Sequence, residues 1–370
     1  MSLTETEQAA LVRWVETELR ERVVSTDLIA DGLNLVVAVS TSGGDYVLRR
    51  PNELRETPMF IDTVTEYRAL ERLVATEVPA PRPVALCRDE SILGAPFLLM
   101  TRLEGDVVPL GSRLPERYRH PAARKRFAHE VIDTLATLHT TPPAPFEEVC
   151  ERHTTADHIA SDIARVERAA DAVPESFPEL VAVGDWLRDH IPEPTDTVLT
   201  HGDYRPGNIL FTEATDPEKF DTTHSRPLPT VSGVLDWETP SLGDPRTELG
   251  YLLLRWRDPG DPTPALDSLR THDETDTVPR DIKQAAASGL APYTSAPGSP
   301  SRHELVTRYE AQTGSSIDPL RFVFVFGAFT LAAVWMTLHA RDGGGDTGLL
   351  PRIDYLRLTA ELAINGRLEL

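Results

Sequence analysis

Lysine is almost absent from this chain of 370 residues. It occurs only at Lys125, Lys219 and Lys283, so arginine supplies nearly all of the 37 basic residues, which face 58 acidic ones. The formal net charge of −21 argues against nucleic acid and anionic membrane surfaces as partners, because both would repel the chain. An acidic surface with so little lysine indicates a salt-rich cytoplasm. A high-GC genome, which replaces Lys by Arg, is the alternative explanation.

Cysteine is also scarce. Cys87 and Cys150 lie far apart, without metal-ligand spacing or the numbers needed for a disulfide framework, which is typical of a reducing cytoplasm. The stretch Met1–Glu5 lacks the basic start and apolar core of a secretory signal, so we expect a cytoplasmic protein. The apolar run Phe322–Leu338 has 17 residues, whereas a membrane span needs roughly 20. We predict a buried core helix there.

Polar residues interrupt two apolar runs around His201–Asn208, which we call the central loop. Val198–Leu199 leads into it and Ile209–Phe211 leads out, a pattern that predicts strand, loop, strand. Asp203 and Asn208 have the spacing of the kinase catalytic loop H-R-D-x-x-x-x-N, in which the Asp takes the hydroxyl proton and the Asn holds a metal ion. Taken alone, the loop also fits a polar turn with an Asx cap.

Two expected strands, residues 35–39 and 46–50, are joined by a glycine-rich hairpin turn. Successive side chains of a strand point to opposite faces, so Arg49 shares its face with Val47. In the kinase strand motif V-A-I-K, the small residue two positions before the lysine faces the nucleotide together with it. Because this half of the chain has no lysine, the same position selects Arg49 rather than Arg50 as the cation for nucleotide phosphates.

Other candidates for the nucleotide site flank this strand. Glu66 lies in a helix expected over residues 59–75, one position off its apolar stripe, where its carboxylate could turn back toward Arg49. Gly32 and Asn34 belong to a turn-rich stretch in which the backbone could approach a phosphate closely. An ordinary hairpin turn explains the same stretch equally well.

A buried strand is expected to end near Met100–Arg102, followed by Leu103 and a turn. If this is the connection between two lobes, backbone groups from Met100 to Arg102 would meet adenine. A core strand followed by a turn fits the same residues.

The rest of the chain is expected to be mainly helical. Asp236 ends an apolar strand about 30 residues after the central loop, where kinases carry the D-F-G aspartate. Asp244 is expected to cap a helix, and His139 is expected to cap the C-terminus of a strong amphipathic helix. Residues 258–303, rich in Pro, Asp, Thr, Ser and Gly, predict an inserted mobile segment.

Taken in order, these features resemble the aminoglycoside phosphotransferase family, small-molecule kinases with a protein-kinase-like fold. Within it, Tyr46–Pro51 and Leu235–Glu238 are similar to the kinase-like domains found beside some acyl-CoA dehydrogenases. The resemblance runs over residues 28–365. It implies an α+β, bilobal fold with a small antiparallel-sheet N-terminal lobe, residues 1–103, and a larger, mainly helical C-terminal lobe, residues 104–370.

The resemblance also implies an ATP-dependent phosphotransferase that moves the γ-phosphoryl group to a hydroxyl of a small molecule, with GTP as the alternative donor. Asp203 would orient or deprotonate the acceptor hydroxyl, and Arg205 would neutralise charge in the transition state. Asn208 and Asp236 would hold Mg²⁺. The acceptor could be an aminoglycoside, a sugar, a choline-like amine or a hydroxyacyl thioester, and the oligomeric state is not predicted.

Two departures from the family pattern concern the nucleotide. Arg49, which Glu66 would fix in place, stands where the family usually has Lys. Asp31–Asn34 is a thin version of the phosphate loop. Both departures bear on nucleotide affinity and on the choice of donor, and neither lies in the central loop.

Two other functions stay open at this point. A non-catalytic, kinase-like nucleotide-binding module would lack a residue of the acceptor or metal site, and none is lacking. A metal-dependent hydrolase would use His201, Asp203 and Asp236 as ligands and would need further ligands close by in the sequence. Only Glu238 and Asp244 offer themselves.

Overall fold

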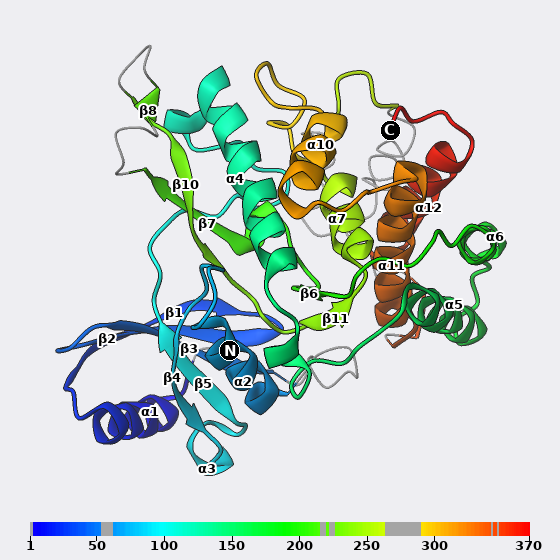
Figure 1. The fold of residues 1–370 in the computed structure, drawn as a ribbon. Coiled ribbons are helices and arrows are strands. Elements are labelled where there is room, and N and C mark those ends of the chain that lie inside the picture. Colours follow the sequence, from blue (N-terminus) through cyan, green and yellow to red (C-terminus); the bar gives the residue numbers. More distant parts are fainter. Residues whose placement is uncertain are drawn as a thin grey trace.

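The computed structural model describes residues 3–52, 62–214, 220–221, 226–262, 290–341, 343–345 and 348–370. An antiparallel sheet forms the N-terminal lobe, and a larger, mainly helical lobe follows it in the chain (Figure 1). The predicted α+β, bilobal architecture is therefore confirmed.

The elements of the N-terminal lobe are α1 (Glu5–Leu19), β1 (Val23–Asp31), β2 (Asn34–Thr41), β3 (Asp45–Pro51), α2 (Thr63–Leu73), β4 (Pro83–Cys87), α3 (Glu90–Leu93) and β5 (Phe97–Thr101). The helices of the C-terminal lobe are α4 (Pro121–Thr140), α5 (Thr155–Asp171), α6 (Pro178–Asp189), α7 (Pro245–Leu254), α10 (Arg302–Thr313), α11 (Leu320–Arg341) and α12 (Leu350–Ile364). Its strands are β6 (Val198–Thr200), β7 (Ile209–Glu213), β8 (Phe220–Asp221), β9 (Arg226–Pro227), β10 (Pro229–Val234) and β11 (Ser241–Gly243), and short 3₁₀ turns span Glu116–Tyr118, Ala144–Phe146 and Pro206–Asn208.

The five-stranded sheet has the order β1-β2-β3-β5-β4, with antiparallel neighbours throughout. Residues directly opposite each other on antiparallel strands share a face. Val36 lies opposite Arg49, Ala38 opposite Val47, and Val47 opposite Met100. One face of the sheet therefore carries Arg49 among apolar side chains, as the strand alternation predicted.

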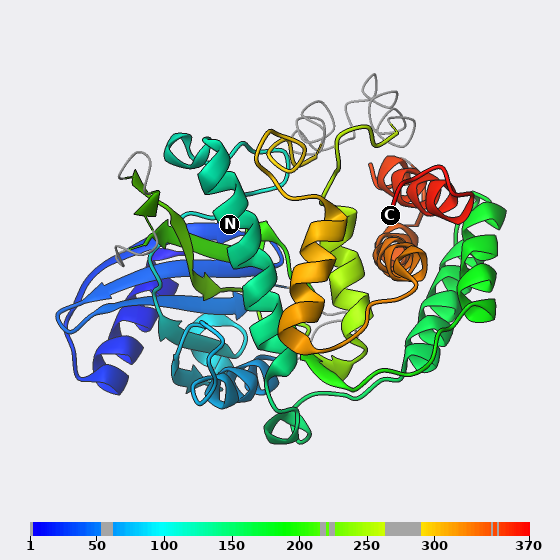
Figure 2. The ribbon, with the colours of Figure 1, turned by 45° about the horizontal axis from the view of Figure 1, so that its top comes forward.

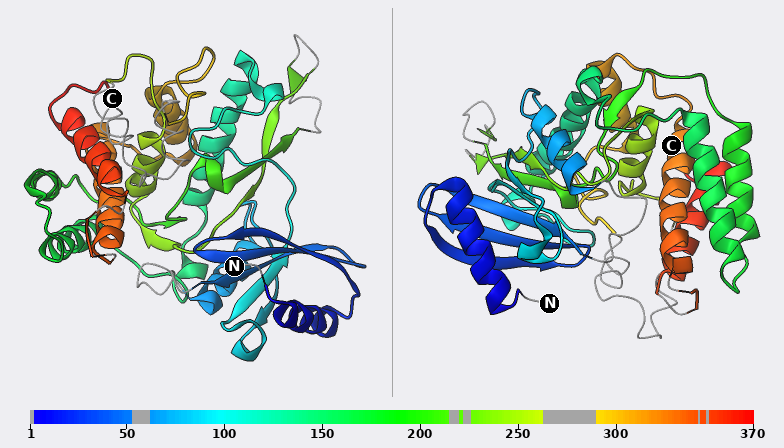
Figure 3. Two further views of the ribbon diagram at one scale, coloured as in Figure 1. Left: turned by 180° about the vertical axis from the view of Figure 1, so that it is seen from behind. Right: turned by 90° about the horizontal axis from the view of Figure 1, so that it is seen from below.

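Helix α1 covers the opposite face of this sheet (Figure 3). Leu11 and Val15 of the helix pack against Leu35, Val37 and Val39 of β2. All five side chains are buried, so this small core holds the sheet as a rigid support for the residues on its other face.

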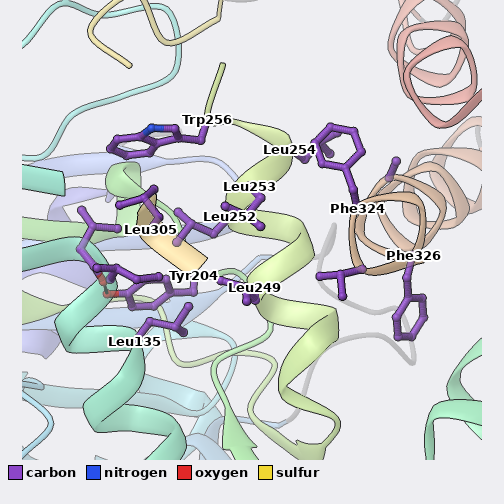
Figure 4. Packing of buried hydrophobic residues seen from close by; sticks show 14 of the residues in the cluster. Leu135, Tyr204, Leu249, Leu252, Leu253, Leu254, Trp256, Leu305, Phe324 and Phe326 are labelled. Atoms are coloured by element: carbon purple, nitrogen blue, oxygen red, sulfur yellow. Dashed lines mark hydrogen bonds between the residues drawn. The ribbon is translucent and has the colours of Figure 1, made fainter. Parts of the chain in front are cut away.

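The central loop lies in the C-terminal lobe, where Tyr204 is fully buried between α4 and α7 (Figure 4). The Tyr204 hydroxyl donates to the Val131 carbonyl of α4 at 2.7 Å. Leu135 of α4 and Leu249 of α7 belong to the same apolar cluster. A buried phenol with a satisfied hydroxyl fixes the backbone on either side of it, so the loop is anchored at its centre.

Helix α7 is positioned by a close crossing with α11 (Figure 2). A Cβ atom on Gly250 would overlap the Val323 carbonyl group, and one on Gly327 would overlap the backbone of Gly250. The two helices therefore pack backbone to backbone, which only glycine permits at these positions. The crossing sets where α7 meets the central loop.

Helix α11 is long and apolar enough to cross a membrane, judged by length and composition alone, and it is the one such helix in the described part of the chain. In the folded chain 67% of its apolar window is buried. Its neighbours are α5, α6, α7 and α12. The predicted buried core helix over Phe322–Leu338 is therefore confirmed.

The structure tests only the two ends of the mobile insertion that was expected at residues 258–303. Residues 263–289 lie outside the described structure, so that stretch is not tested. At its C-terminal end, however, Leu290, Ala291 and Tyr293 are buried in the core of the C-terminal lobe. The expectation was wrong there, because apolar side chains near the end of a polar segment are enough to dock it.

Candidate active site

Three short elements shape the central loop. Strand β6, which pairs with β11, enters the loop, and β7, which pairs with β10, leaves it. Between them the 3₁₀ turn Pro206–Asn208 is closed by the Asn208 N–H, which donates to the Arg205 carbonyl at 2.8 Å. The predicted strand, loop, strand pattern is confirmed, and the tight turn orients the Asn208 side chain.

That turn brings Asn208 back onto Asp203. The Asn208 Nδ2 atom donates to Oδ2 of Asp203 at 2.7 Å and to the Asp203 carbonyl at 3.0 Å. Arg205 adds its Nε atom, 3.1 Å from each carboxylate oxygen. The side chains of Arg205 and Asn208, both predicted from the loop sequence, therefore both contact the Asp203 carboxylate.

Asp236 lies beside this group. The Leu235 N–H donates to the Asn208 carbonyl at 2.8 Å, and the Leu235 carbonyl contacts Nε2 of His201 at 2.7 Å. Directly after this anchor, Asp236 adopts a left-handed backbone with φ of 73°, which is rare for a residue other than glycine. The carboxylate ends up on the open side of the strands, with 37% of its side chain exposed.

Arg49 joins the N-terminal lobe to this site. Its Nη1 atom lies 2.7 Å from Oε1 of Glu66 in α2, and its Nη2 atom contacts the carboxylates of Asp236 and Glu238. Glu66 is 1% exposed, so its predicted turn toward Arg49 is present as a buried ion pair. Arg50 points elsewhere, to the Leu93 carbonyl at 2.7 Å, as strand alternation requires.

The charges around Arg49 fix its ionisation and that of Asp236. Burial works to lower the pKa of Arg49, but Glu66 and Asp236 outweigh it and hold that pKa above its usual value. Burial works to raise the pKa of Asp236, but the cation of Arg49 and the nearby His201 and Arg205 hold it below the usual range. Both side chains are charged at neutral pH.

The expected phosphate-loop residues occupy different places. Gly32 is exposed at the β1–β2 turn, where its N–H donates to the Asn34 carbonyl at 3.1 Å. Asn34 is buried, and its side chain donates to Glu238, 204 residues further along the chain. Asn34 therefore ties the start of β2 to the segment that contains Asp236.

The expected adenine contacts at Met100–Arg102 need a correction. Strand β5 lies between β3 and β4, so its backbone is paired on both sides. The Thr101 N–H donates to the Arg82 carbonyl at 2.9 Å, and the Arg102 N–H donates to the Asp45 carbonyl at 3.0 Å. The Arg102 amide is thus committed to the sheet, whereas the Met100 side chain faces the same side as Arg49.

The sequence of the chain matches the model of one family, described as the phosphotransferase enzyme family, over residues 27–281. That match covers more than half of the chain and includes Arg49, the central loop and Asp236.

The chain belongs to the phosphotransferase enzyme family.

Solved structures that are similar to this chain share its fold. A Ralstonia eutropha crystal structure assigned to the aminoglycoside phosphotransferases is 25% identical, covers 98% of this chain and 99% of its own, and superposes with a TM-score of 0.69. A complex of an aminoglycoside phosphotransferase with GDP and kanamycin is 15% identical over 96% of this chain and 98% of its own, with a TM-score of 0.55, which shows the shared fold.

Acyl-CoA dehydrogenase family member 10 of Mus musculus is a curated relative. It is 26% identical over 302 residues, which cover 80% of this chain and 24% of that protein. The chain therefore spans about a quarter of the length of the first curated relatives that it matches.

Sequence analysis missed a buried carboxylate beneath the central loop. Glu248 of α7 accepts the N–H groups of His201, at 2.9 and 3.0 Å, and of Gly202, at 2.7 Å. His139 contacts Glu248 at 3.0 Å through Nε2 and the Tyr309 hydroxyl at 2.7 Å through Nδ1. The expectation that His139 caps α4 was wrong, because its ring is buried and turned toward this carboxylate.

Tyr251 was also missed. It lies one turn after Glu248 on α7, and its hydroxyl donates to Oδ1 of Asp203. Burial and the neighbouring Asp203 raise the pKa of Tyr251 although the nearby Arg255 lowers it, so the phenol keeps its proton. The Arg255 guanidinium lies 3.8 Å from the centre of the Tyr251 ring. The spacing of these residues on α7 follows no sequence motif.

The donor atoms near Asp236 fit a magnesium ion. Asn208 uses its amide nitrogen on Asp203, which leaves the amide oxygen for a cation beside the Asp236 carboxylate. Three carboxylates surround the single guanidinium of Arg49, an excess of negative charge that suits a cation. Mg²⁺ is commonly held by one or two protein oxygens together with substrate phosphates. The described residues contain no group of three or more His, Cys, Asp and Glu that could hold a metal.

Proposed function

We propose that this chain is an ATP-dependent phosphotransferase that moves the γ-phosphoryl group to a hydroxyl of a small molecule. The observation that carries the proposal is that Asn208 bonds to the Asp203 carboxylate while Leu235, the residue before Asp236, bonds to the Asn208 carbonyl. Phosphoryl transfer depends mainly on positioning and charge neutralisation, and these side chains are positioned by backbone hydrogen bonds.

Acceptor activation is assigned to Asp203. Its carboxylate would accept the proton of the acceptor hydroxyl, in the role that the kinase aspartate has. Arg205 lies 3.1 Å from that carboxylate and would neutralise negative charge as the phosphoryl group moves. Burial works to lower the pKa of Arg205, but Asp203 holds it above its usual value, so the cation is present throughout.

The donor nucleotide is assigned to the face of the sheet that carries Arg49. Val36, Val47 and Met100 share this face and are half-buried, which leaves apolar surface for a purine ring. Arg49 would hold the phosphates, and the polypeptide after Arg102 would meet the edge of the base. The GDP complex of the related aminoglycoside phosphotransferase supports nucleotide binding in this fold, and GTP is the alternative donor.

Asn208 and Asp236 would hold Mg²⁺ between themselves and the nucleotide phosphates. The ion would supply charge neutralisation on the phosphates when bound. The chain's own contribution is to fix the two oxygen ligands, Asn208 through its bond to Asp203 and Asp236 through the backbone of Leu235.

A screen for ADP release over hydroxylated metabolites tests the proposal. It would cover aminoglycosides, sugars, choline-like amines and hydroxyacyl thioesters, with ATP and GTP as donors. Asp203→Ala should reduce turnover on the true acceptor by at least about 10², the low end for loss of a general base. Asp185→Ala, at an exposed ion pair with Arg188, is the matched control and should keep full turnover. An Asp203→Ala enzyme with wild-type turnover would refute the assignment.

Calorimetry separates an enzyme from a non-catalytic nucleotide-binding module. Asp236→Ala should abolish the Mg²⁺-dependent part of nucleotide binding, and unchanged binding would count against the metal assignment. A chain that binds ATP with Mg²⁺ but releases no ADP with any acceptor in the screen would favour the module.

A further inference from the structure

Each oxygen of the Asp203 carboxylate already accepts a hydrogen bond from another side chain of the protein. Oδ1 accepts from the Tyr251 hydroxyl and faces Arg205 Nε at 3.1 Å. Oδ2 accepts from Asn208 Nδ2 at 2.7 Å and faces Arg205 Nε at 3.1 Å. An acceptor hydroxyl must come within hydrogen-bond reach of the same carboxylate before its proton can be taken. An acceptor hydroxyl therefore competes with the donors that are already present.

Tyr251 is the donor whose departure disturbs the loop least. Arg205 and Asn208 belong to the central loop, two and five residues after Asp203, so their contacts form with the fold of the loop itself. Tyr251 reaches Asp203 from α7, 48 residues further along the chain. It is also the one hydroxyl that the described residues bring to this carboxylate, and so the same chemical group that an acceptor would present.

We propose that the Tyr251 hydroxyl holds the acceptor's place on Asp203 and that an acceptor hydroxyl displaces it. The inference rests on the proposed phosphotransferase function. In the absence of an acceptor, Tyr251 keeps the carboxylate occupied, so Asp203 does not orient a water molecule toward the nucleotide. Tyr251 thereby suppresses wasteful hydrolysis.

Arg255 restricts how far the Tyr251 side chain moves during this exchange. Its guanidinium stacks on the Tyr251 ring at 3.8 Å, and its Nη1 atom donates to the Tyr251 carbonyl at 3.0 Å. A cation over an aromatic face holds the ring in place, so a small movement of the hydroxyl is enough to release Asp203. After the product leaves, the same stack returns the hydroxyl to the carboxylate.

Hydrolysis of ATP without any acceptor measures the exchange directly. In that reaction the water oxygen bonds to the γ-phosphorus, the bond to ADP breaks, and the water proton passes to Asp203. Tyr251→Phe keeps the stacked ring and removes only the hydroxyl. We expect ADP release with ATP, Mg²⁺ and water alone to rise about tenfold, because a hydrogen bond to a charged group changes an equilibrium by about that factor or more. The KM for ATP should not change.

Tyr46→Phe is the matched control. It also removes a tyrosine hydroxyl from a carboxylate, that of Glu21 at 3.2 Å, but at the far side of the N-terminal lobe, and basal hydrolysis should stay at the wild-type rate. The double variant Tyr251→Phe with Asp203→Ala should lose the rise, since Tyr251 acts through Asp203. A rate that is unchanged in Tyr251→Phe overturns the inference. A lower rate of ADP release in Tyr251→Phe also overturns the inference. It would show instead that Tyr251 positions the Asp203 carboxylate for catalysis.

A thermal-shift assay separates this inference from the function on which it rests. If ATP with Mg²⁺ does not raise the melting temperature of the wild-type chain, the proposed function fails and the place-holder role fails with it. If the nucleotide stabilises the chain but Tyr251→Phe shows no rise in ADP release, only the place-holder role is overturned.

Discussion

The backbone N–H of Gly202 donates to Oε1 of Glu248 at 2.7 Å. Gly202 stands where the kinase motif H-R-D has arginine, and its φ of 84° is left-handed. A Cβ atom there would overlap the carbonyl oxygen of Thr239. The loop is thus held from below by a buried carboxylate, which needs a backbone path that glycine follows without strain.

Glu248→Gln should destabilise the chain by about 3 kcal/mol. The carboxylate accepts from His201, Gly202 and His139, whereas an amide has one accepting oxygen and turns its NH₂ group toward another donor. Urea unfolding measures the loss. Glu147→Gln, at an exposed ion pair with Arg152, is the control and should change stability by less than about 0.5 kcal/mol. Equal losses in the two variants would contradict the role of Glu248.

Gly202→Ala should cost about 3 kcal/mol or more. An L-residue in the left-handed region costs roughly 1–2 kcal/mol, and the overlap with Thr239 adds to it. Gly94→Ala isolates the first contribution, since Gly94 has a similar φ of 78° with open space around it. The difference between the two melting shifts therefore measures the contact with Thr239. If the shifts are equal, the close approach does not limit this position.

Arg49→Lys should weaken the junction between the lobes, although it keeps the charge. The planar guanidinium of Arg49 contacts Glu66, Asp236 and Glu238 together. The lysine side chain is shorter and ends in a single ammonium group, so it would leave a buried carboxylate without its partner. We expect a loss of about 2–3 kcal/mol in unfolding free energy and a smaller melting shift on adding ATP with Mg²⁺.

Arg50→Lys is the control for that change. Arg50 is the next residue on β3 and bonds to the Leu93 carbonyl and Asn52, away from Arg49, so its nucleotide-induced shift should match that of the wild type. A full nucleotide response in Arg49→Lys would show that the family's usual lysine serves equally well in this sheet.

Local patterns were enough to predict much of the fold and part of the site. Strand alternation, read together with the kinase strand motif, separated Arg49 from Arg50, and the spacing within the central loop assigned Asp203 and Asn208 to one site. These contacts follow from the geometry of one strand or one turn, which is short-range and leaves a trace in the sequence.

The residues that were missed depend on packing between distant helices. Glu248 and Tyr251 reach the central loop because α7 crosses α11 where two glycines meet, and no period in the sequence of α7 records that crossing. His139 is in the last turn of its helix, where capping is the common local role, but its ring bonds to Glu248, 109 residues away. The Arg102 amide was misassigned because strand order in the sheet is also non-local.

Asp244→Asn should destabilise the chain at pH 7 by about 3 kcal/mol, since it leaves the buried guanidinium of Arg246 unpaired. Burial works to raise the pKa of Asp244, but hydrogen bonds from Arg246 and Thr155 outweigh it and hold that pKa below 3.8. The folded chain therefore binds this proton more weakly than the unfolded chain does. The stability that the carboxylate adds is complete above the pKa of Asp244 in the unfolded chain and is lost as the pH falls through its pKa in the folded chain.

Urea unfolding from pH 7 to pH 3 should show the unfolding free energies of the wild type and of Asp244→Asn converging below about pH 4. Asp89→Asn, at an exposed helix cap without an arginine, is the control and should run parallel to the wild type near neutral pH. Asparagine keeps the cap at both positions, so a gap that stays constant down to pH 3 would assign the loss in Asp244→Asn to packing rather than to charge.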